Sequence, residues 1–296
     1  MIEELTLHAH STALFSTWIL LEELRLLLDC GDGVMAGLGH KSRKVRLVAM
    51  SHGDRDHVMG LPQFLHHNAL HGLAGVLYPK DSYTFPAMKA FSESFDPHTK
   101  AVVPWIGLVD GEDWELQRGM VVRAMVNTHI PGARARSMGW QVVRQFRKLR
   151  PELTGTPGPE IARLRKEGGD DAVTQPFEET LITFSGDTGE MEASIYGSPR
   201  LLIHEATFLS PDDLEEERPG HRHSCLPAVL QLAKEIAPEK LVLTHFSSRY
   251  PIEQIRTAVA SGCAELAISF PVWIVPPMRT AWDLLRQTPV YAPVSE

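Results

Sequence analysis

The sequence predicts a layered α/β fold in which buried strands alternate with helices. Short apolar, β-branched runs recur along the chain, at 45–50, 121–126, 181–184, 201–203 and 241–243. Runs of this length and content are typical of buried strands. Helical patterns lie between several of them, at 61–70, 226–236 and 252–260. This alternation favours helices layered on sheets.

Each of the five predicted strands leads directly into residues that can bind a metal ion. In chain order these residues are His52, His129, Asp187, His204-Glu205 and His245. A single histidine after a strand is usually a cap or a hydrogen-bonded core residue. Loops beyond the strand ends gather the functional residues of such folds, so a recurrence at five strand ends indicates one shared metal site.

The segment from Ser51 to His57 is expected to form the centre of that site. Imidazole nitrogens and carboxylate oxygens suit divalent zinc, manganese or iron. His52 and Asp54 point the same way if the turn after the strand stays extended, so they can share one ion. Asp56 and His57 come just before Gly60-Leu61-Pro62, where a helix can begin, and they can face a second ion.

Three residues from other strand ends would complete the two metal shells. Asp187 could bridge two cations, because a carboxylate has two oxygens. His129 and His245 would supply the remaining nitrogens. The chain has 3 cysteines, an odd number in no paired spacing, which argues against a disulfide framework and a thiolate zinc site.

Composition indicates a soluble globular protein with no membrane partner. Of the 296 residues, 43% are hydrophobic and 22% are charged, which are ordinary values for such proteins. No apolar run is long enough to span a bilayer, and the start, Met1-Ile2-Glu3-Glu4, is acidic where a secretory signal would be basic. We therefore expect a cytoplasmic location.

The charge is uneven along the chain. The net charge of -8 disfavours nonspecific binding to nucleic acid. From Arg134 to Lys166, however, there are nine basic residues against Glu152 and Glu160, so an anionic partner is expected to bind here, unless this is only a solvated basic helix. Dense proline and glycine at about 149–175 predict a short exposed arm on a single domain spanning 1–296.

Several motifs together resemble a known family. The pattern His52-x-Asp54-x-Asp56-His57 resembles the HxHxDH motif of the metallo-β-lactamase superfamily. Five further segments resemble motifs of its ribonuclease Z branch, namely Asp29-Cys30-Gly31-Asp32-Gly33, Ser185-Gly186-Asp187-Thr188, His204-Glu205-Ala206-Thr207, His223-Ser224 and the run from Leu243 to Tyr250. The resemblance covers residues 28–250 and implies an αββα four-layer sandwich.

The resemblance also implies a role for each site residue. His52, Asp54, His129 and Asp187 would hold one metal ion. Asp56, His57, Asp187 and His245 would hold the other, and Asp56 would also orient the nucleophile. His223 would be the catalytic histidine, supported by Glu205; without the resemblance these two are an ordinary surface histidine and loop carboxylate. Arg249 would hold a phosphate oxygen, with a surface salt bridge as the alternative.

Two departures from the family pattern affect these expectations. Position 54 is Asp where the family has a second His, which shifts the expected metal from Zn²⁺ toward Mn²⁺ or Fe²⁺. If Asp54 does not bind, the protein would hold one metal or be inactive. The Gly155-Thr156-Pro157-Gly158-Pro159 step resembles the family's tRNA-binding arm, but the arm is shorter and lacks its aromatic-glycine step.

The function expected from the resemblance is metal-dependent cleavage of precursor tRNA at its 3′ end. Two divalent ions, Zn²⁺ foremost, would activate water as hydroxide, and a homodimer is a family expectation. The nearest alternative substrate is a cyclic nucleotide or another small phosphodiester. A lactone or thioester hydrolase and an inactive metal-binding scaffold are the remaining alternatives.

Overall fold

Two β-sheets face each other at the centre of the molecule. The structure, a computed structural model, describes residues 4–95, 103–130, 136–216 and 222–293; Arg134 of the basic segment lies outside them. The first sheet has the strand order β1-β2-β3-β4-β5-β6. Its strands are β1 (Leu7–Thr12), β2 (Ser16–Leu21), β3 (Leu26–Leu28), β4 (Leu47–Ala49), β5 (Gly75–Pro79) and β6 (Trp105–Leu108).

The second sheet has the order β13-β12-β11-β10-β9-β8-β7. Its strands are β7 (Asp113–Gln117), β8 (Met120–Val126), β9 (Met138–Leu149), β10 (Thr174–Phe184), β11 (Leu201–Glu205), β12 (Lys240–Thr244) and β13 (Val272–Ile274). Strands β10 to β13 are parallel, so the loops that follow β10, β11 and β12 all leave from one edge of the sheet.

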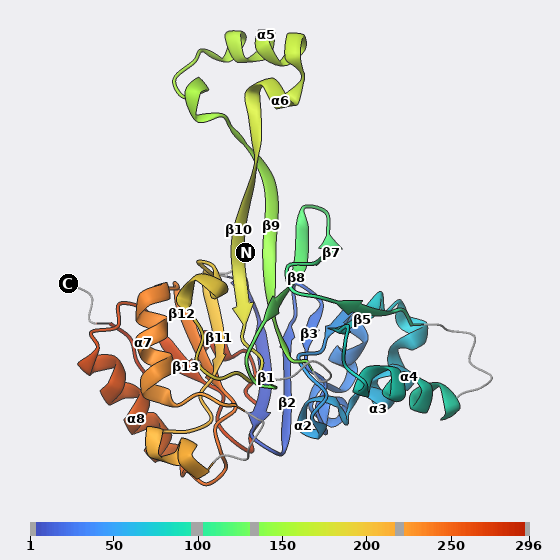
Figure 1. Ribbon diagram of the computed structural model, residues 1–296, viewed down its shortest axis with the longest axis vertical. Coiled ribbons are helices and arrows are strands. Elements are labelled where there is room, and N and C mark those ends of the chain that lie inside the picture. Colours follow the sequence, from blue (N-terminus) through green and yellow to red (C-terminus); the bar gives the residue numbers. More distant parts are fainter. Residues whose placement is uncertain (1–3, 96–102, 131–135, 217–221, 294–296) are drawn as a thin grey trace.

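Helices cover the outer face of each sheet, so the molecule has four layers. On the first sheet lie α1 (Val34–Leu38), α3 (Leu61–Asn68) and α4 (Thr84–Phe95), and on the second lie α7 (Leu226–Ile236) and α8 (Ile252–Glu265) (Figure 1). Alternation within a strand divides its side chains between layers. Ile203 packs in the core between the sheets, whereas Leu202 packs under the helices of the second sheet.

The predicted elements agree closely with this structure. The five predicted strands correspond to β4, β8, the end of β10, β11 and β12, and the three helical patterns to α3, α7 and α8. One local expectation was incomplete. Asp56 and His57 do not merely precede a helix, because they lie within a separate one, α2 (Arg55–Val58), whose N-cap Asp54 is extended.

A long arm projects from the second sheet, and it exceeds the short arm expected at about 149–175 because the paired strands β9 and β10 extend it on both sides. Strands β9 and β10 pair in antiparallel fashion from Trp140↔Phe184 to Leu149↔Thr174, and α5 (Gly158–Gly168) and α6 (Asp170–Val173) lie at the tip (Figure 1). At about 3.3 Å per residue, the ten steps of β10 place the tip roughly 33 Å from the end of the strand that leads to Asp187.

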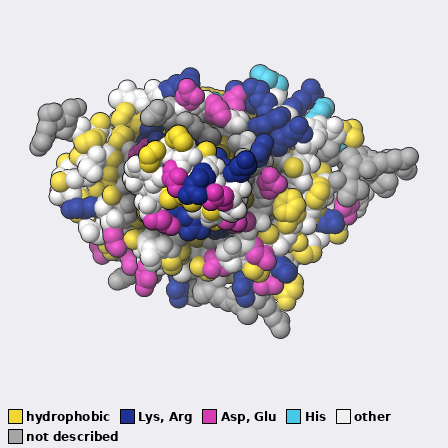
Figure 2. All heavy atoms as spheres, turned by 90° about the horizontal axis from the view of Figure 1, so that it is seen from above, with side chains coloured by type: hydrophobic (Ala, Val, Ile, Leu, Met, Phe, Trp, Pro, Cys, Tyr) yellow, Lys and Arg dark blue, Asp and Glu magenta, His cyan; other side chains and the backbone are white. Residues whose placement is uncertain are grey.

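The arm carries opposite charges side by side. Residues 138–184 contain seven basic and seven acidic residues, so the arm is formally neutral. Arg144 pairs with Glu179, Arg147 with Asp171, and Arg163 with Glu160 and Glu167. Figure 2, seen from the arm end, shows Lys/Arg and Asp/Glu side chains intermingled at the tip. The positive charge of 134–166 is therefore balanced within the arm by carboxylates that lie in this segment and by those that follow it.

No helix of the described residues is long and apolar enough to cross a membrane.

Candidate metal centre

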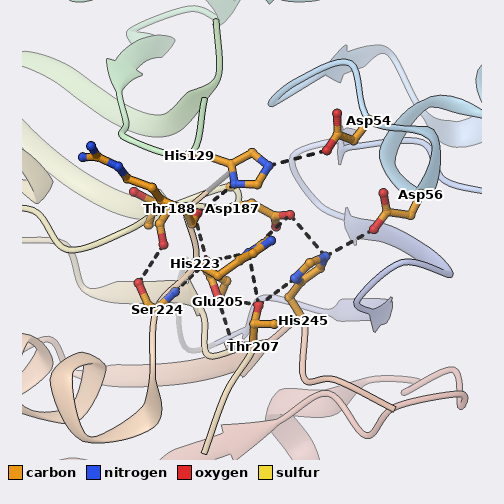
Figure 3. Close-up of polar contacts among 12 residues, drawn as sticks. Asp54, Asp56, His129, Asp187, Thr188, Glu205, Thr207, His223, Ser224 and His245 are labelled. Carbon is orange, nitrogen blue, oxygen red and sulfur yellow. Dashed lines mark hydrogen bonds and ion pairs between the residues drawn. The ribbon is translucent and has the colours of Figure 1, made fainter. Parts of the chain in front are cut away.

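Histidine and aspartate side chains from both sheets converge at one edge of the sandwich. The loop after β4 and helix α2 supply His52, Asp54, Asp56 and His57, and the loops after β8, β10 and β12 supply His129, Asp187 and His245. Figure 3 shows five members of this set, Asp54, Asp56, His129, Asp187 and His245. Four of the five predicted strand ends thus contribute their predicted residue to the cluster.

The first half of the cluster contains His52, Asp54 and His129. Oδ2 of Asp54 lies 3.7 Å from Nε2 of His52 and 3.6 Å from Nε2 of His129. Nε2 of His52 also lies 3.7 Å from Oδ2 of Asp187. This nitrogen is buried and makes no hydrogen bond within the described part of the chain, which is costly unless another group satisfies it.

The second half contains Asp56, His57 and His245 around the same Asp187. Oδ2 of Asp187 lies 3.2 Å from Nε2 of His57 and 3.2 Å from Nε2 of His245. Nε2 of His245 lies 3.4 Å from Oδ2 of Asp56. Asp187 is therefore shared by both halves.

These separations fit ligands of common metal ions. Two ligand atoms about 2.1 Å from one tetrahedral ion lie about 3.4 Å from each other, and the distances of 3.2 to 3.7 Å in the two halves bracket that value. Burial acts to raise the pKa of Asp187, but His245 and His57 hold that pKa well below its ordinary value. The carboxylate is thus anionic at neutral pH, as a metal ligand must be.

Hydrogen bonds also orient each histidine ring for metal binding. Nδ1 of His57 donates to Asp29 Oδ2 at 2.8 Å, and Nδ1 of His129 donates to the carbonyl of Arg222 at 2.8 Å. The hydroxyl of Ser51 donates its proton to Asp29. Its Oγ therefore accepts a hydrogen bond from Nδ1 of His52 at 2.9 Å. The Nδ1 proton of each ring is thus held by an acceptor outside the cluster, so Nε2 is the nitrogen that would bind a metal ion, with loss of any proton that it carries.

Asp29 is a supporting residue that the sequence argument did not assign. It is fully buried, and besides His57 it accepts hydrogen bonds from the backbone N–H and hydroxyl of Ser51. It has a φ of 56°, a conformation that non-glycine residues seldom adopt. The available signal was its place in the Asp29-Cys30-Gly31 turn that resembles a family motif; in the structure this turn directly follows β3, which ends at Leu28.

A second network surrounds Glu205 at the end of β11. Its Oε1 accepts hydrogen bonds from the backbone N–H groups of Thr188 and Ser224 and from Nδ1 of His223, at 3.0 to 3.1 Å. Its Oε2 accepts from the N–H and hydroxyl of Thr207. Burial acts to raise the pKa of Glu205, but the neighbouring His223 lowers it below the ordinary value.

Thr207 connects this network to the metal-ligand cluster. Its hydroxyl donates to Glu205 at 2.7 Å, so it accepts from Nδ1 of His245 at 2.9 Å. His245 therefore also turns its Nε2 toward Asp187. The ring of His223 stacks on that of His245 with centroids 5.4 Å apart, and its centroid lies 4.6 Å from that of His129. His223 therefore lies beside both halves of the cluster (Figure 3).

Two residues lie apart from the cluster. His204, the first of the two residues considered at the end of the fourth strand, is buried under the outer helices, where Tyr196 OH donates to its Nε2 and its Nδ1 donates to the carbonyl of Glu205. That strand end therefore contributes Glu205 only. The guanidinium of Arg249 lies 3.6 Å from Asp213 and 5.4 Å from the ring of Phe208, which favours the salt-bridge interpretation of Arg249.

Comparison with known proteins identifies relatives over most of the chain. A family model described as "Beta-lactamase superfamily domain" matches residues 24–246. "tRNase Z TRZ2, chloroplastic" from Arabidopsis thaliana is 27% identical over 272 residues, which cover 87% of this chain and 70% of the relative. "Ribonuclease Z" from Methanosarcina acetivorans is 29% identical over 255 residues, which cover 76% of this chain and 79% of the relative.

Solved structures share the fold. The short form of human tRNase Z superposes with a TM-score of 0.57 at 19% identity, covering 93% of this chain and 98% of that one. The metallo-beta-lactamase fold protein YhfI from Bacillus subtilis gives a TM-score of 0.60 at 16% identity, covering 93% and 99%. Both agree with the predicted αββα architecture.

Proposed function

The chain belongs to the beta-lactamase superfamily, and we propose that it is a dinuclear-metal phosphodiesterase of the ribonuclease Z type. The observation that carries this proposal is the pairing of two histidine–carboxylate half-sites around Asp187 with a separate His223–Glu205 pair beside them. Hydrolysis of a phosphodiester needs an activated water and a proton for the leaving oxygen, and these two features supply one each.

We propose that His52, Asp54, His129 and Asp187 hold one divalent ion. Asp56, His57, His245 and the same Asp187 hold the other. Each ion then has two imidazoles, one carboxylate of its own and the shared one. Zn²⁺ suits the imidazoles best, and the hard oxygen of Asp54 makes Mn²⁺ or Fe²⁺ competitive in the first half.

The chain's own residues then divide the chemistry between them. Ions bound here would make hydroxide available at neutral pH. Asp56 orients the attacking nucleophile in line with the leaving oxygen. His223 donates a proton to that oxygen from Nε2, since Glu205 accepts the hydrogen bond from Nδ1 and fixes the ring. Glu205 itself is held by backbone N–H groups on two sides, so the donor cannot swing away from the cluster.

The proposed substrate is precursor tRNA, cut after the 3′ end of the mature sequence. Relatives named tRNase Z and ribonuclease Z align over most of this chain. The projecting arm supports a long substrate, because it extends the molecule roughly 33 Å beyond the strand end that leads to the site, a reach that a small molecule would not use.

A small phosphodiester is the second candidate substrate, and one observation favours it. The arm is formally neutral, and its arginines pair with its own carboxylates. Affinity for an RNA backbone comes largely from unpaired Lys and Arg side chains that displace counterions. Binding of RNA at this arm therefore requires the exchange of internal ion pairs for phosphate contacts.

A direct comparison of substrates tests the proposal. Protein loaded separately with Zn²⁺, Mn²⁺ and Fe²⁺ is incubated with 3′-extended precursor tRNA, a cyclic nucleotide and an aryl phosphodiester. We expect a single cut in the precursor after its mature 3′ end. Cleavage of the aryl ester alone would refute the tRNA assignment, and inertness with every metal would favour a metal-binding scaffold.

A further inference from the structure

Four of the eight non-glycine residues with a positive φ in the described part of the chain lie in or beside the candidate metal centre. Positive φ angles occur at Asp29 (56°) and His245 (62°), which support or form the cluster, and also at Leu14 (67°) and Met278 (60°). For a residue other than glycine this conformation is unfavourable, and such strain concentrates at functional sites. The positions of Leu14 and Met278 therefore call for an explanation.

The turn between β1 and β2 is fastened to the second half of the centre. The backbone N–H of Leu14 donates to Oδ2 of Asp56 at 2.9 Å, the oxygen that lies 3.4 Å from His245 Nε2. The N–H of Ala13 donates to the carbonyl of Phe246 at 3.3 Å. Asp56 is a candidate metal ligand, and Phe246 directly follows another one, His245. The turn between β1 and β2 therefore forms the rim of the site.

Met278 adjoins the same turn from the far end of the chain. Its backbone N–H donates to Oγ1 of Thr12, the last residue of β1, at 2.7 Å. Two segments more than 250 residues apart in sequence thus meet beside Asp56 and His245.

The side chains at this rim are large, apolar and exposed. Leu14 is 82% exposed, Phe15 50% and Met278 57%; we call these three residues the apolar rim. Their side chains gain little from burial, and glycine would suit the backbone better at positions 14 and 278. Since neither folding nor local conformation favours large apolar side chains at these positions beside Asp56, they are candidates for contact with a bound molecule.

We propose that the apolar rim binds the nucleobase adjoining the scissile phosphodiester, so that the site selects nucleotide esters over simple alkyl esters. A base offers a flat apolar face that stacks on an aromatic ring whatever its sequence, and Phe15 provides such a ring next to Leu14. The rim adjoins Asp56, so a base held there belongs to a nucleotide whose phosphate lies at the metal-ligand cluster. The inference rests on the proposed phosphodiesterase function and adds that the site recognises the nucleobase of its substrate.

Binding measurements test this inference without turnover. The metal-loaded protein is titrated calorimetrically with uridine 5′-monophosphate and, separately, with methyl phosphate, which differ in the nucleoside. We expect the nucleotide to bind about tenfold more tightly, the ratio that about 1.4 kcal/mol produces. Phe15→Ala should reduce this ratio to near one while leaving the affinity for methyl phosphate within twofold, and Phe15→Trp should preserve it.

Two further variants separate binding from folding. Leu14→Gly relieves the positive φ, so the melting temperature should stay the same or rise while the nucleotide loses affinity severalfold. Phe91→Ala removes a ring of similar exposure, 52%, from helix α4 and should change neither ligand's affinity. Equal wild-type affinities for the two ligands, failure to bind either, or a ratio that survives Phe15→Ala would overturn the inference. Precursor cleavage, assayed separately, reports on the proposed function alone.

Discussion

His223 and Glu205 form the pair whose chemistry is most readily isolated by mutation. His223 contacts Glu205 at 3.1 Å through Nδ1 and is not among the proposed metal ligands. Loss of a general acid commonly lowers turnover about 10²–10⁴-fold. We expect His223→Ala to lower kcat by that amount for a phosphodiester with a poor leaving group, while the metal content by mass spectrometry stays at that of the wild type. An equal loss of bound metal and of kcat in His223→Ala would contradict the assignment of His223 as the general acid.

Asp54 is the residue at which this chain departs from the HxHxDH motif that it resembles. Its side chain is 37% exposed and faces His52 and His129. Replacing its hard oxygen with an imidazole should favour zinc. We expect Asp54→His, dialysed against equal Zn²⁺ and Mn²⁺, to raise the bound Zn:Mn ratio severalfold, as read by mass spectrometry. An unchanged ratio would mean that Asp54 does not bind the ion.

The sequence predicted the residues that converge in the cluster better than the residues that orient them. His52, His129, Asp187 and His245 were predicted because each follows a strand, and strand ends converge in such folds. Asp29 and Thr207 were not, because their contacts with His57 and His245 depend on how separate loops pack. A pattern in one sequence carries no direct information on such packing.

Among the elements, the strands were the most predictable and the short helices the least. The runs at 201–203 and 241–243 correspond to β11 and β12 because their apolar content matches strands buried on both faces. Helix α2, with only Arg55–Val58, is too short to show a helical period, and tertiary contacts determine it. The full length of β9 and β10 was also not predictable, because their halves within the arm have no buried face and therefore no apolar alternation.

An ion-pair network joins the β2–β3 connection to the 3₁₀ helix Gly39–Lys44. Glu22 contacts His8 at 2.9 Å and Lys41 and Lys44 at 2.6 Å each. Burial acts to raise the pKa of Glu22, but hydrogen bonds from Lys41, Lys44 and His8 lower it to about 2. This folded-state pKa lies below the unfolded value of about 4.3.

The stabilisation by Glu22 should therefore depend on pH in a definite direction. It is fully present above pH about 4.3 and is lost as the pH falls toward 2. We expect Glu22→Gln to cost about 1 kcal/mol at pH 7, a small value because Lys44 is 53% exposed, and the cost to shrink below pH 4. Urea unfolding at several pH values measures this, with exposed Glu265→Gln as the control. A pH-independent difference would contradict it.

On the scale of the whole molecule, the arm is the feature that distinguishes a long substrate from a short one. The paired residues Leu149 and Thr174 can be joined by an Asn-Gly turn, which suits a two-residue hairpin. We expect deletion of residues 150–173 in this way to lower kcat/KM for precursor tRNA at least tenfold and to leave that for an aryl phosphodiester within twofold. A parallel loss on both substrates would show that the arm supports the fold instead.

A cytoplasmic location and a homodimer stay predictions from the sequence. Light scattering on the eluted protein tests the second, since a dimer has twice the 33.0 kDa mass of the chain. The network of hydrogen bonds around Asp29 and Glu205 lies within one chain, so the account of the metal centre does not depend on the outcome.

We propose that two metal ions and the His223–Glu205 pair together hydrolyse a phosphodiester in precursor tRNA. The most direct measurement is the cleavage rate of 3′-extended precursor tRNA by the metal-loaded protein, with the cut position mapped to the nucleotide. The account predicts one cut after the mature 3′ end, abolished by a chelator and restored by added Zn²⁺ or Mn²⁺. A precursor left intact while an aryl phosphodiester is hydrolysed would contradict it.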